Sequence, residues 1–354
     1  MATTNPATPA AALQGYVELF VRGTAAWTRA WRDCTDCGLG RSWRELREAQ
    51  LDVSALVPLL ALAVTWTVLR RVTTARLFQP LARWLQLRPS DASKFPESAW
   101  KLLYYTPAWL YSSYLLFWRG HSFFHNPPSV FYGWQSRSLV PWDIYTAYIL
   151  QGSFYAHSMF GTLYMDAWRR DSVVMLVHHF ITLSLIVCSY AFRYHNVGLL
   201  AFFLHDASDI QLEFTKLNVY MKYRGGTYHP MNNFLSNIGC ISFGISWFVF
   251  RLYWFPLKVL YATCITSLQT VPDIPFYFFF NILLFAITLI NLYWFMMIMM
   301  FVAKVILGRI KEVNDVREYD VHVEADQTCW RNIRLSPSGK GKAHVNGMIK
   351  NKRQ

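Results

Sequence analysis

Residues 274–303 form the longest uncharged part of the chain, with no Asp, Glu, Lys or Arg between Asp273 and Lys304. An apolar stretch of about 20 residues is long enough to cross a bilayer as a helix. Comparable stretches recur along the chain, so the sequence predicts an all-α, polytopic membrane protein with about seven transmembrane helices. The predicted spans cover residues 53–71, 98–118, 141–165, 173–192, 197–218, 234–255 and 274–303.

The composition agrees with a membrane protein and argues against a nucleic-acid-binding protein. Only 16% of the residues are charged, compared with roughly 25% in soluble domains. The net charge of +13 could indicate nucleic-acid binding, but most Lys and Arg residues lie in short loops beside apolar stretches. The six cysteines lack metal-finger spacing, and the lone C-x-x-C of Cys34 and Cys37 favours incidental cysteines or a local disulfide over a zinc site.

The distribution of basic residues predicts the orientation. Lys and Arg concentrate in alternate loops, beginning with residues 72–97 and ending after the seventh span. Such loops face the cytosol, so residues 1–52 are predicted to be lumenal and the C-terminus cytosolic, although the N-terminal segment is itself basic. Residues 312–354 are polar and are predicted to form a disordered tail.

The chain ends in "KNKRQ", which places Lys350 and Lys352 near the C-terminus. This spacing resembles the dilysine signal that returns membrane proteins to the endoplasmic reticulum, and that signal acts only on a cytosolic terminus. A basic tail without a retrieval function is the alternative interpretation.

Ionisable residues inside the predicted spans are candidates for function, because charge is costly in hydrocarbon. The fourth span carries His178 and His179, and the fifth carries Asp206, Asp209 and Glu213 on one helical face. Adjacent histidines point about 100° apart on a helix, so both cannot aim at one partner. His178 and Asp209 both fall in the cytosolic half of their spans, so the two side chains can meet.

Residue spacing alone leaves four uses open for this group. An imidazole beside a carboxylate can serve acyl transfer as base or nucleophile. The same residues could relay protons in a transporter, bind a metal or join helices as a structural network. Two other polar residues suggest simpler roles: Arg251 can extend to the interface near the lumenal end of its span, and Asn291 can join helices.

The segments "DSVVMLVHHFITLSLIVCSYAFRYHNVG" and "LLAFFLHDASDIQLEFTKLNVY" resemble the signature of the ceramide synthases, a family of the TLC-domain superfamily. "FPESAWK" and "DIPFYFFFNILL" extend this resemblance over about residues 94–311. Most animal members carry a homeobox-like insert after the first span, and residues 72–97 are too few for it. The chain is therefore most similar to the members that lack the insert, which are associated with stearoyl-CoA and C18 ceramides.

The resemblance implies a sphingosine N-acyltransferase of the endoplasmic-reticulum membrane. Its TLC domain, residues 98–311, would form a helical bundle around an acyl-chain tunnel open to the cytosol. The implied catalytic residues are His178, His179, Asp206 and Asp209. Acyl-CoA would be a co-substrate, with no bound cofactor or metal. The implied partners are acyl-CoA, a sphingoid base, membrane lipids and, as a dimer, the chain itself or another ceramide synthase.

His178 could attack the thioester to form an acyl-imidazole, or it could remove a proton from the sphingoid amine. An adjacent Asp would orient the ring and stabilise its cationic form. Two other classes stay open. A non-enzymatic TLC-domain protein would bind or translocate lipids, and a membrane metalloenzyme such as a lipid hydroxylase would need more clustered histidines.

The segment between the sixth and seventh spans, "YATCITSLQTVPD", is predicted to be a lumenal loop that sets acyl-chain length, because a tunnel open to the cytosol ends near the lumen. The family resemblance points to the same segment. Its residues are Tyr261, Ala262, Thr263, Cys264, Ile265, Thr266, Ser267, Leu268, Gln269, Thr270, Val271, Pro272 and Asp273.

Overall fold

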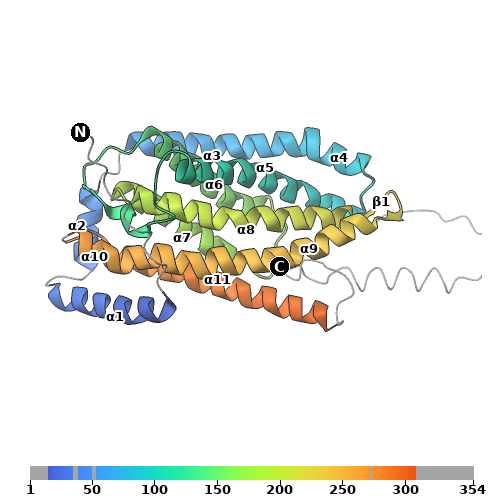
Figure 1. The fold of residues 1–354 in the computed structure, drawn as a ribbon. Coiled ribbons are helices and arrows are strands. Elements are labelled where there is room, and N and C mark those ends of the chain that lie inside the picture. The colour runs from blue at the N-terminus through green and yellow to red at the C-terminus, as the bar shows by residue number, and fades with distance from the viewer. Residues whose placement is uncertain (1–14, 35–38, 50–52, 272, 308–354) are drawn as a thin grey trace, which may run out of the picture.

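The computed structural model describes residues 15–34, 39–49, 53–271 and 273–307. Long helices run side by side along one axis and form a bundle (Figure 1). Each predicted span overlaps one of these helices, although the sixth, 234–255, runs past the end of its helix at Trp247, and the described chain is almost entirely helical, which confirms the predicted all-α membrane fold. The helices are α3 (Val53–Thr73), α5 (Pro89–Phe117), α6 (Trp142–Tyr164), α7 (Ser172–Ala191), α8 (His195–Met221), α9 (Pro230–Trp247) and α11 (Tyr277–Ile306).

Four helical segments of the described chain are long and apolar enough to cross a membrane by themselves: Ser54–Trp84, Ser172–Ala191, Pro230–Thr270 and Tyr277–Lys304. Helices α5, α6 and α8 have 29, 23 and 27 residues, which is also sufficient length. They are more polar because they carry buried polar side chains into the bundle. The prediction of seven crossings therefore stays a prediction.

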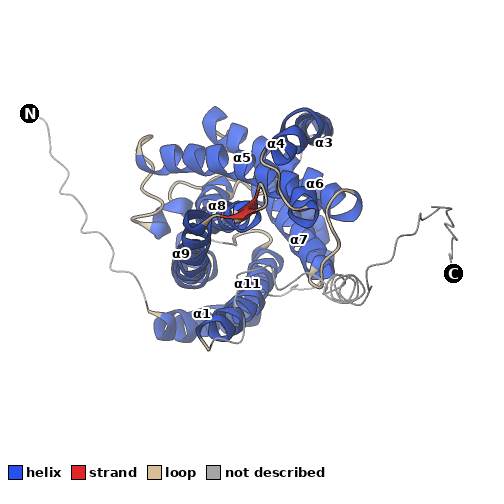
Figure 2. Ribbon diagram, turned by 90° about the vertical axis from the view of Figure 1, so that its right-hand side faces the viewer, coloured by secondary structure: helices blue, strands red, loops and turns tan. Residues whose placement is uncertain are grey.

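Helix α8 is the centre of the bundle. It packs against α5, α6, α7 and α9, and the end-on view in Figure 2 shows it surrounded by other helices. Leu199, Leu200 and Leu204 near its start are at most 1% exposed. The polar residues that follow them on α8 are therefore held inside the protein.

Two segments that the sequence predicted as connections are largely helical. After α3, the π-helix η1 (Thr74–Phe78) and α4 (Gln79–Trp84) occupy much of the predicted linker 72–97. After α9, the chain continues as the π-helices η3 (Phe248–Leu260) and η4 (Ala262–Thr266) and as α10 (Ser267–Thr270). Pro256 lies within η3 and cannot donate a backbone hydrogen bond, which is one local reason for departure from regular α-helix.

The remaining elements are short or lie outside the bundle. The N-terminal segment forms α1 (Tyr16–Asp33) and α2 (Leu39–Glu48), which the sequence did not predict. The other elements are η2 (Pro127–Phe131) and the antiparallel strands β1 (Tyr223–Arg224) and β2 (Thr227–Tyr228), joined by Gly225 and Gly226 at positive φ.

Some predicted features fall outside the described residues. They include the tail 312–354 with Lys350 and Lys352, and also Cys37 and Pro272. Cys34 is described and takes part in a disulfide bond, while the local disulfide favoured for the C-x-x-C motif stays a prediction.

Candidate active site

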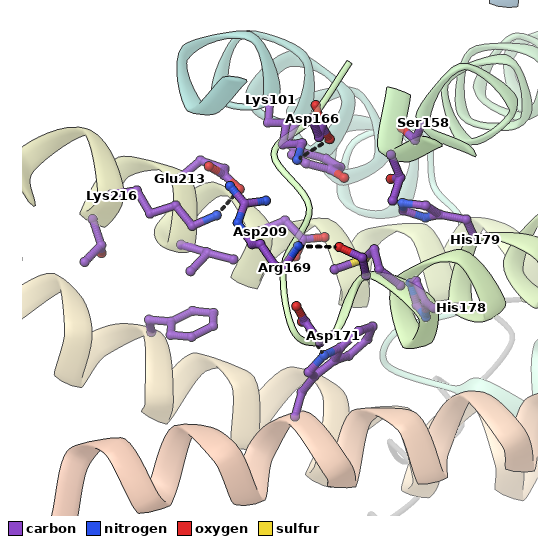
Figure 3. Close-up of a pocket in the computed structure, with 18 of the residues that line it drawn as sticks. Lys101, Ser158, Asp166, Arg169, Asp171, His178, His179, Asp209, Glu213 and Lys216 are labelled. Carbon is purple, nitrogen blue, oxygen red and sulfur yellow. Dashed lines mark hydrogen bonds and ion pairs between the residues drawn. The ribbon is translucent and has the colours of Figure 1, made fainter. Parts of the chain in front are cut away.

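A cavity of about 210 Å³ lies inside the bundle, bordered by α5, α6, α7, α8, α9, η3 and α11. Charged side chains line it toward the end of the bundle that carries α4, hereafter the α4 end. Figure 3 shows His178 and His179 on one side of this cavity and Glu213 and Lys216 on the other. The cavity thus joins a charged region to two histidines deeper in the bundle.

Both histidines of α7 line this cavity, although adjacent positions point apart on a helix. His178 and His179 are 6% and 7% exposed, and their ring centroids are 5.7 Å apart. Trp294 of α11 packs edge-on to His178 at 5.1 Å, and Tyr155 of α6 packs edge-on to His179 at 5.7 Å. Aromatic contacts from two neighbouring helices therefore hold the imidazoles in place.

The Nδ1 atoms of His178 and His179 are buried and have no hydrogen-bond partner among the described residues. A buried polar atom without a partner costs about 1–3 kcal/mol, so native proteins keep few of them. The carboxylate–imidazole contact expected from the sequence is absent from the described part of the chain. Both rings are instead left with unused hydrogen-bonding capacity beside the cavity.

Asp209 lines the cavity, but its partner is an arginine rather than a histidine. Its Oδ1 accepts a hydrogen bond from Arg251 Nη2 at 2.7 Å. Arg251 is 2% exposed and lies inside the bundle, so the prediction that it extends to the membrane interface is wrong. Burial among polar partners explains the difference, because a paired guanidinium has no need to reach water.

Asp206 occupies a different environment. Its Oδ2 accepts a hydrogen bond of 2.5 Å from Gln151 of α6, and its side chain does not line either of the two cavities described here. The structure therefore brings three of the four predicted catalytic residues to one cavity, namely His178, His179 and Asp209. Asp206 faces α6 instead.

Charged side chains at the α4 end pair with one another. Arg169, in the connection between α6 and α7, donates hydrogen bonds of 2.8 and 3.0 Å to the two carboxylate oxygens of Glu97. Lys101 pairs with Glu97 at 2.7 Å and with Asp166 at 3.2 Å, and Arg70 pairs with Asp166 as well. Burial favours the neutral acid, yet the positive charges of Lys101 and Arg70 hold the pKa of Asp166 below its usual value.

A second, smaller cavity of about 60 Å³ lies farther from the α4 end. Thr182, Leu185 and Ser189 of α7 line it, and these residues follow the histidines by successive turns. Tyr155 lines both cavities and separates the polar one from this apolar one. The apolar cavity therefore adjoins the polar cavity at Tyr155, on the side away from the α4 end.

The predicted loop 261–273 is helical through Thr270, and its described residues do not line either cavity. It is fastened to α11, which does line the apolar cavity. Tyr277 Oη donates a hydrogen bond of 2.7 Å to the Cys264 carbonyl, and Asn281 Nδ2 donates one of 3.3 Å to the Thr263 carbonyl. The segment can therefore influence the cavity through the position of α11.

Within the described residues, no group of three or more His, Cys, Asp and Glu side chains is arranged to hold a metal ion.

Sequence reasoning missed several residues around the cavity. Tyr155, Trp294 and, outside the cavity, Gln151 carry no signal in one sequence that separates them from ordinary packing residues. Lys101 is a charged residue within the predicted span 98–118, and that signal was passed over. Arg251 did carry one, because a charge within a predicted span is by default a candidate for function. Because Arg251 lies near the end of a predicted span, the sequence favoured extension of its side chain to the membrane interface instead.

The family model described as the TLC domain matches residues 94–300. The helical bundle with its buried polar cavity is thus the fold of a TLC-domain membrane protein. The chain is 57% identical to ceramide synthase 1 of Homo sapiens and 54% identical to ceramide synthase 1 of Mus musculus, each over 96% of this chain and 95% of the relative. It is also 32% identical to ceramide synthase LOH1 of Arabidopsis thaliana, over 63% of this chain and 72% of that protein. The chain belongs to the ceramide synthase family.

Proposed function

We propose that the protein transfers the acyl group of a fatty acyl-CoA to the amine of sphinganine or sphingosine, and so forms dihydroceramide or ceramide. The observation that carries this proposal is the pair of buried histidines, His178 and His179, with unpartnered Nδ1 atoms beside a cavity in a member of this family. Acyl-CoA is a co-substrate, and the chemistry requires no bound cofactor.

The reaction needs a nucleophile more than it needs bond activation, because a thioester already has a good leaving group. In one route, His178 attacks the thioester carbonyl, the carbon–sulfur bond breaks and CoA leaves as its thiolate. The neutral sphingoid amine then attacks the acyl carbon, the bond from that carbon to the imidazole nitrogen breaks, and the amine proton passes to the released imidazole of His178. In the other route, His178 accepts the amine proton while the amine attacks the thioester carbonyl directly, the carbon–sulfur bond breaks, and the imidazolium returns the proton to the leaving thiolate of CoA.

The two cavities suggest how the substrates lie. The thioester would sit beside His178 and His179, with CoA toward the α4 end and the acyl chain in the apolar cavity. The distance along α7 from His178 to Ser189 is about 16 Å at a rise of roughly 1.5 Å per residue. The apolar lining of the second cavity supports an acyl-chain site, and the preference for the C18 chain of stearoyl-CoA is proposed from the resemblance to the family members that lack the insert.

We further propose that segment 261–273 sets the preferred chain length by fixing α11. Phe280 and Leu284 of α11 line the apolar cavity, and Tyr277 and Asn281 fasten the start of this helix to the segment. A change in the segment would shift α11 and alter the space left for the last carbons of the acyl chain.

A direct test is to incubate the purified protein with sphinganine and acyl-CoAs of graded length and to identify the products by mass. The expected product is dihydroceramide, with the C18 species most abundant. Failure to form an amide from any acyl-CoA would contradict the acyltransferase and favour a lipid-binding or translocating TLC-domain protein.

The proposed location is the membrane of the endoplasmic reticulum, with residues 1–52 in the lumen and the C-terminus in the cytosol. The disulfide bond of Cys34 supports an oxidising compartment for the N-terminal segment.

Replacing Lys350 and Lys352 with Ser is expected to leave acyl transfer intact and to release protein to later compartments. An unchanged distribution of the variant on imaging would contradict the retrieval signal.

A dimer of the protein with a second copy of itself or with another ceramide synthase is also proposed, and cross-linking in membranes would test it.

A further inference from the structure

Arg251 joins three helical segments at the wall of the polar cavity. Its Nε donates a hydrogen bond of 2.7 Å to Ser208 Oγ, and its Nη2 donates bonds of 2.9 Å to the His205 carbonyl and 2.7 Å to Asp209 Oδ1. Its Nη1 lies 3.5 Å from Asn291 Oδ1 of α11. A guanidinium has five N–H donors in a rigid plane, so these contacts fix its orientation.

The face of the guanidinium is also occupied. Its central carbon lies 4.0 Å from the centroid of the Trp247 ring, a cation–π contact that is favourable in a desolvated site. Arg251 is thus held from its edge by α8 and α11 and from its face by α9. Such a residue can hold a bound carboxylate in one position.

Asp209 uses only part of its carboxylate in this arrangement. Arg251 binds Oδ1, while Oδ2 has no hydrogen-bond partner among the described residues. The Asp209 side chain is 18% exposed, compared with 3% for Arg251, and both residues line the cavity that contains His178. The Asp209 carboxylate is therefore accessible from the cavity and retains hydrogen-bonding capacity at Oδ2.

We propose that Arg251 is a positioning residue that aims Asp209 Oδ2 at the amine of the sphingoid base. This inference rests on the proposed function. The amine is the polar N–H donor that the long-chain base must bring into the membrane interior, where an unpaired polar group is costly. A hydrogen bond from the amine nitrogen to Asp209 Oδ2 satisfies that donor and holds the nitrogen beside the acyl group on the histidine side of the cavity.

The test compares Arg251→Lys with Asp209→Asn and with the double variant. Lys keeps the positive charge, so the variant is expected to fold. It loses the planar set of N–H donors, so it no longer holds the Asp209 carboxylate in one orientation. Arg251→Lys is expected to raise the KM for sphinganine about tenfold or more, and to change the KM for acyl-CoA by less than about twofold. Because Arg251 acts through Asp209, the double variant is expected to be no worse than Asp209→Asn.

Lys258→Met is the matched control. Lys258 is a second buried cation of η3, it donates a hydrogen bond of 2.7 Å to the Phe124 carbonyl, and it lines neither cavity. Its loss tests whether removal of any buried charge from η3 disturbs the site. The KM for sphinganine is expected to stay within about twofold of the wild-type value.

Binding of radiolabelled sphinganine to the protein in nanodiscs, without acyl-CoA, separates this proposal from the proposed function. Weaker binding to Arg251→Lys but not to Lys258→Met supports the positioning role even if no ceramide forms. Equal increases in both KM values, or further loss of activity in the double variant, would show a general structural role and overturn it. Unchanged binding and kinetics in Arg251→Lys would overturn it as well.

Discussion

The two ends of the polar cavity use ionisable residues in opposite ways. At the α4 end, Lys101 and Arg169 are paired with carboxylates, and Glu97 accepts hydrogen bonds at both of its oxygens. Deeper in the bundle, His178 and His179 keep buried Nδ1 atoms without partners. Paired charges stabilise the arrangement of helices, whereas unsatisfied groups retain capacity to bind a reactant. The comparison predicts that substitutions at the α4 end change stability and substitutions at the histidines change chemistry.

The largest expected effect is the loss of N-acylation in His178→Ala. Alanine favours a helix and is apolar, so the variant is expected to insert and fold while lacking the nucleophile or base. Ceramide formation measures the activity of the variant, and size-exclusion elution in detergent measures its folding. His195→Ala is the control, because His195 is also a buried histidine with an unpartnered Nδ1 but lies outside both cavities. Retained activity in His178→Ala would remove the histidine from the mechanism.

Mass measurement of the intact protein distinguishes the two routes for His178. The acyl-imidazole route predicts that wild-type protein given acyl-CoA alone gains the mass of the acyl group and that His178→Ala does not. If His178 is required but no such mass ever forms, the general-base route is supported.

The next effect separates the two aspartates. Asp209→Asn is expected to lower kcat/KM about 100-fold or more, because an amide cannot supply the negative charge beside the reacting groups. Asp206→Asn is expected to lower activity much less, since Asp206 contacts Gln151 outside the cavity and an amide oxygen can still accept that hydrogen bond. Steady-state kinetics on both variants check this order. An equal loss of kcat/KM in the two variants would indicate that Asp206 also takes part in catalysis.

At the α4 end, Asp166→Asn is expected to reduce stability by roughly 3–5 kcal/mol, because it leaves the buried guanidinium of Arg70 without its carboxylate partner, while Lys101 keeps Glu97. The folded-state pKa of Asp166 is lower than the ordinary value of 3.8. Its stabilising contribution is therefore present above that value and is lost as the pH falls through the lower folded-state pKa. Thermal unfolding in detergent between neutral and acid pH measures both effects. An Asp166→Asn profile with the same acid dependence as wild type would contradict the assignment.

The sequence predicted the helices well because long apolar stretches have few alternatives to a membrane span. It also predicted that His178 and Asp209 lie at similar depth in adjacent helices, and both line the same cavity, but the expected contact between them is absent from the described residues. The pairing of Asp209 with Arg251 could not be predicted, because it depends on how η3 packs against α8. Segment 261–273 was wrongly predicted to be a loop, since helix continuation through η4 and α10 depends on contacts with α11.

The smallest expected effect concerns segment 261–273 and acts on selectivity rather than rate. Its described residues contact α11 and do not line the cavities. The segment can therefore change the space available to the acyl chain only indirectly, through small movements of Phe280 and Leu284 on α11. One methylene in an apolar pocket is worth about 1–3 kcal/mol, which makes preference graded. Exchange with the segment of a family member that prefers longer chains is expected to shift the product distribution by a few carbons, with total turnover within about threefold. Phe280→Ala and Leu284→Ala, which enlarge the apolar cavity directly, are expected to shift the distribution in the same direction. A shift in these two variants but not in the exchange would locate selectivity in α11 alone.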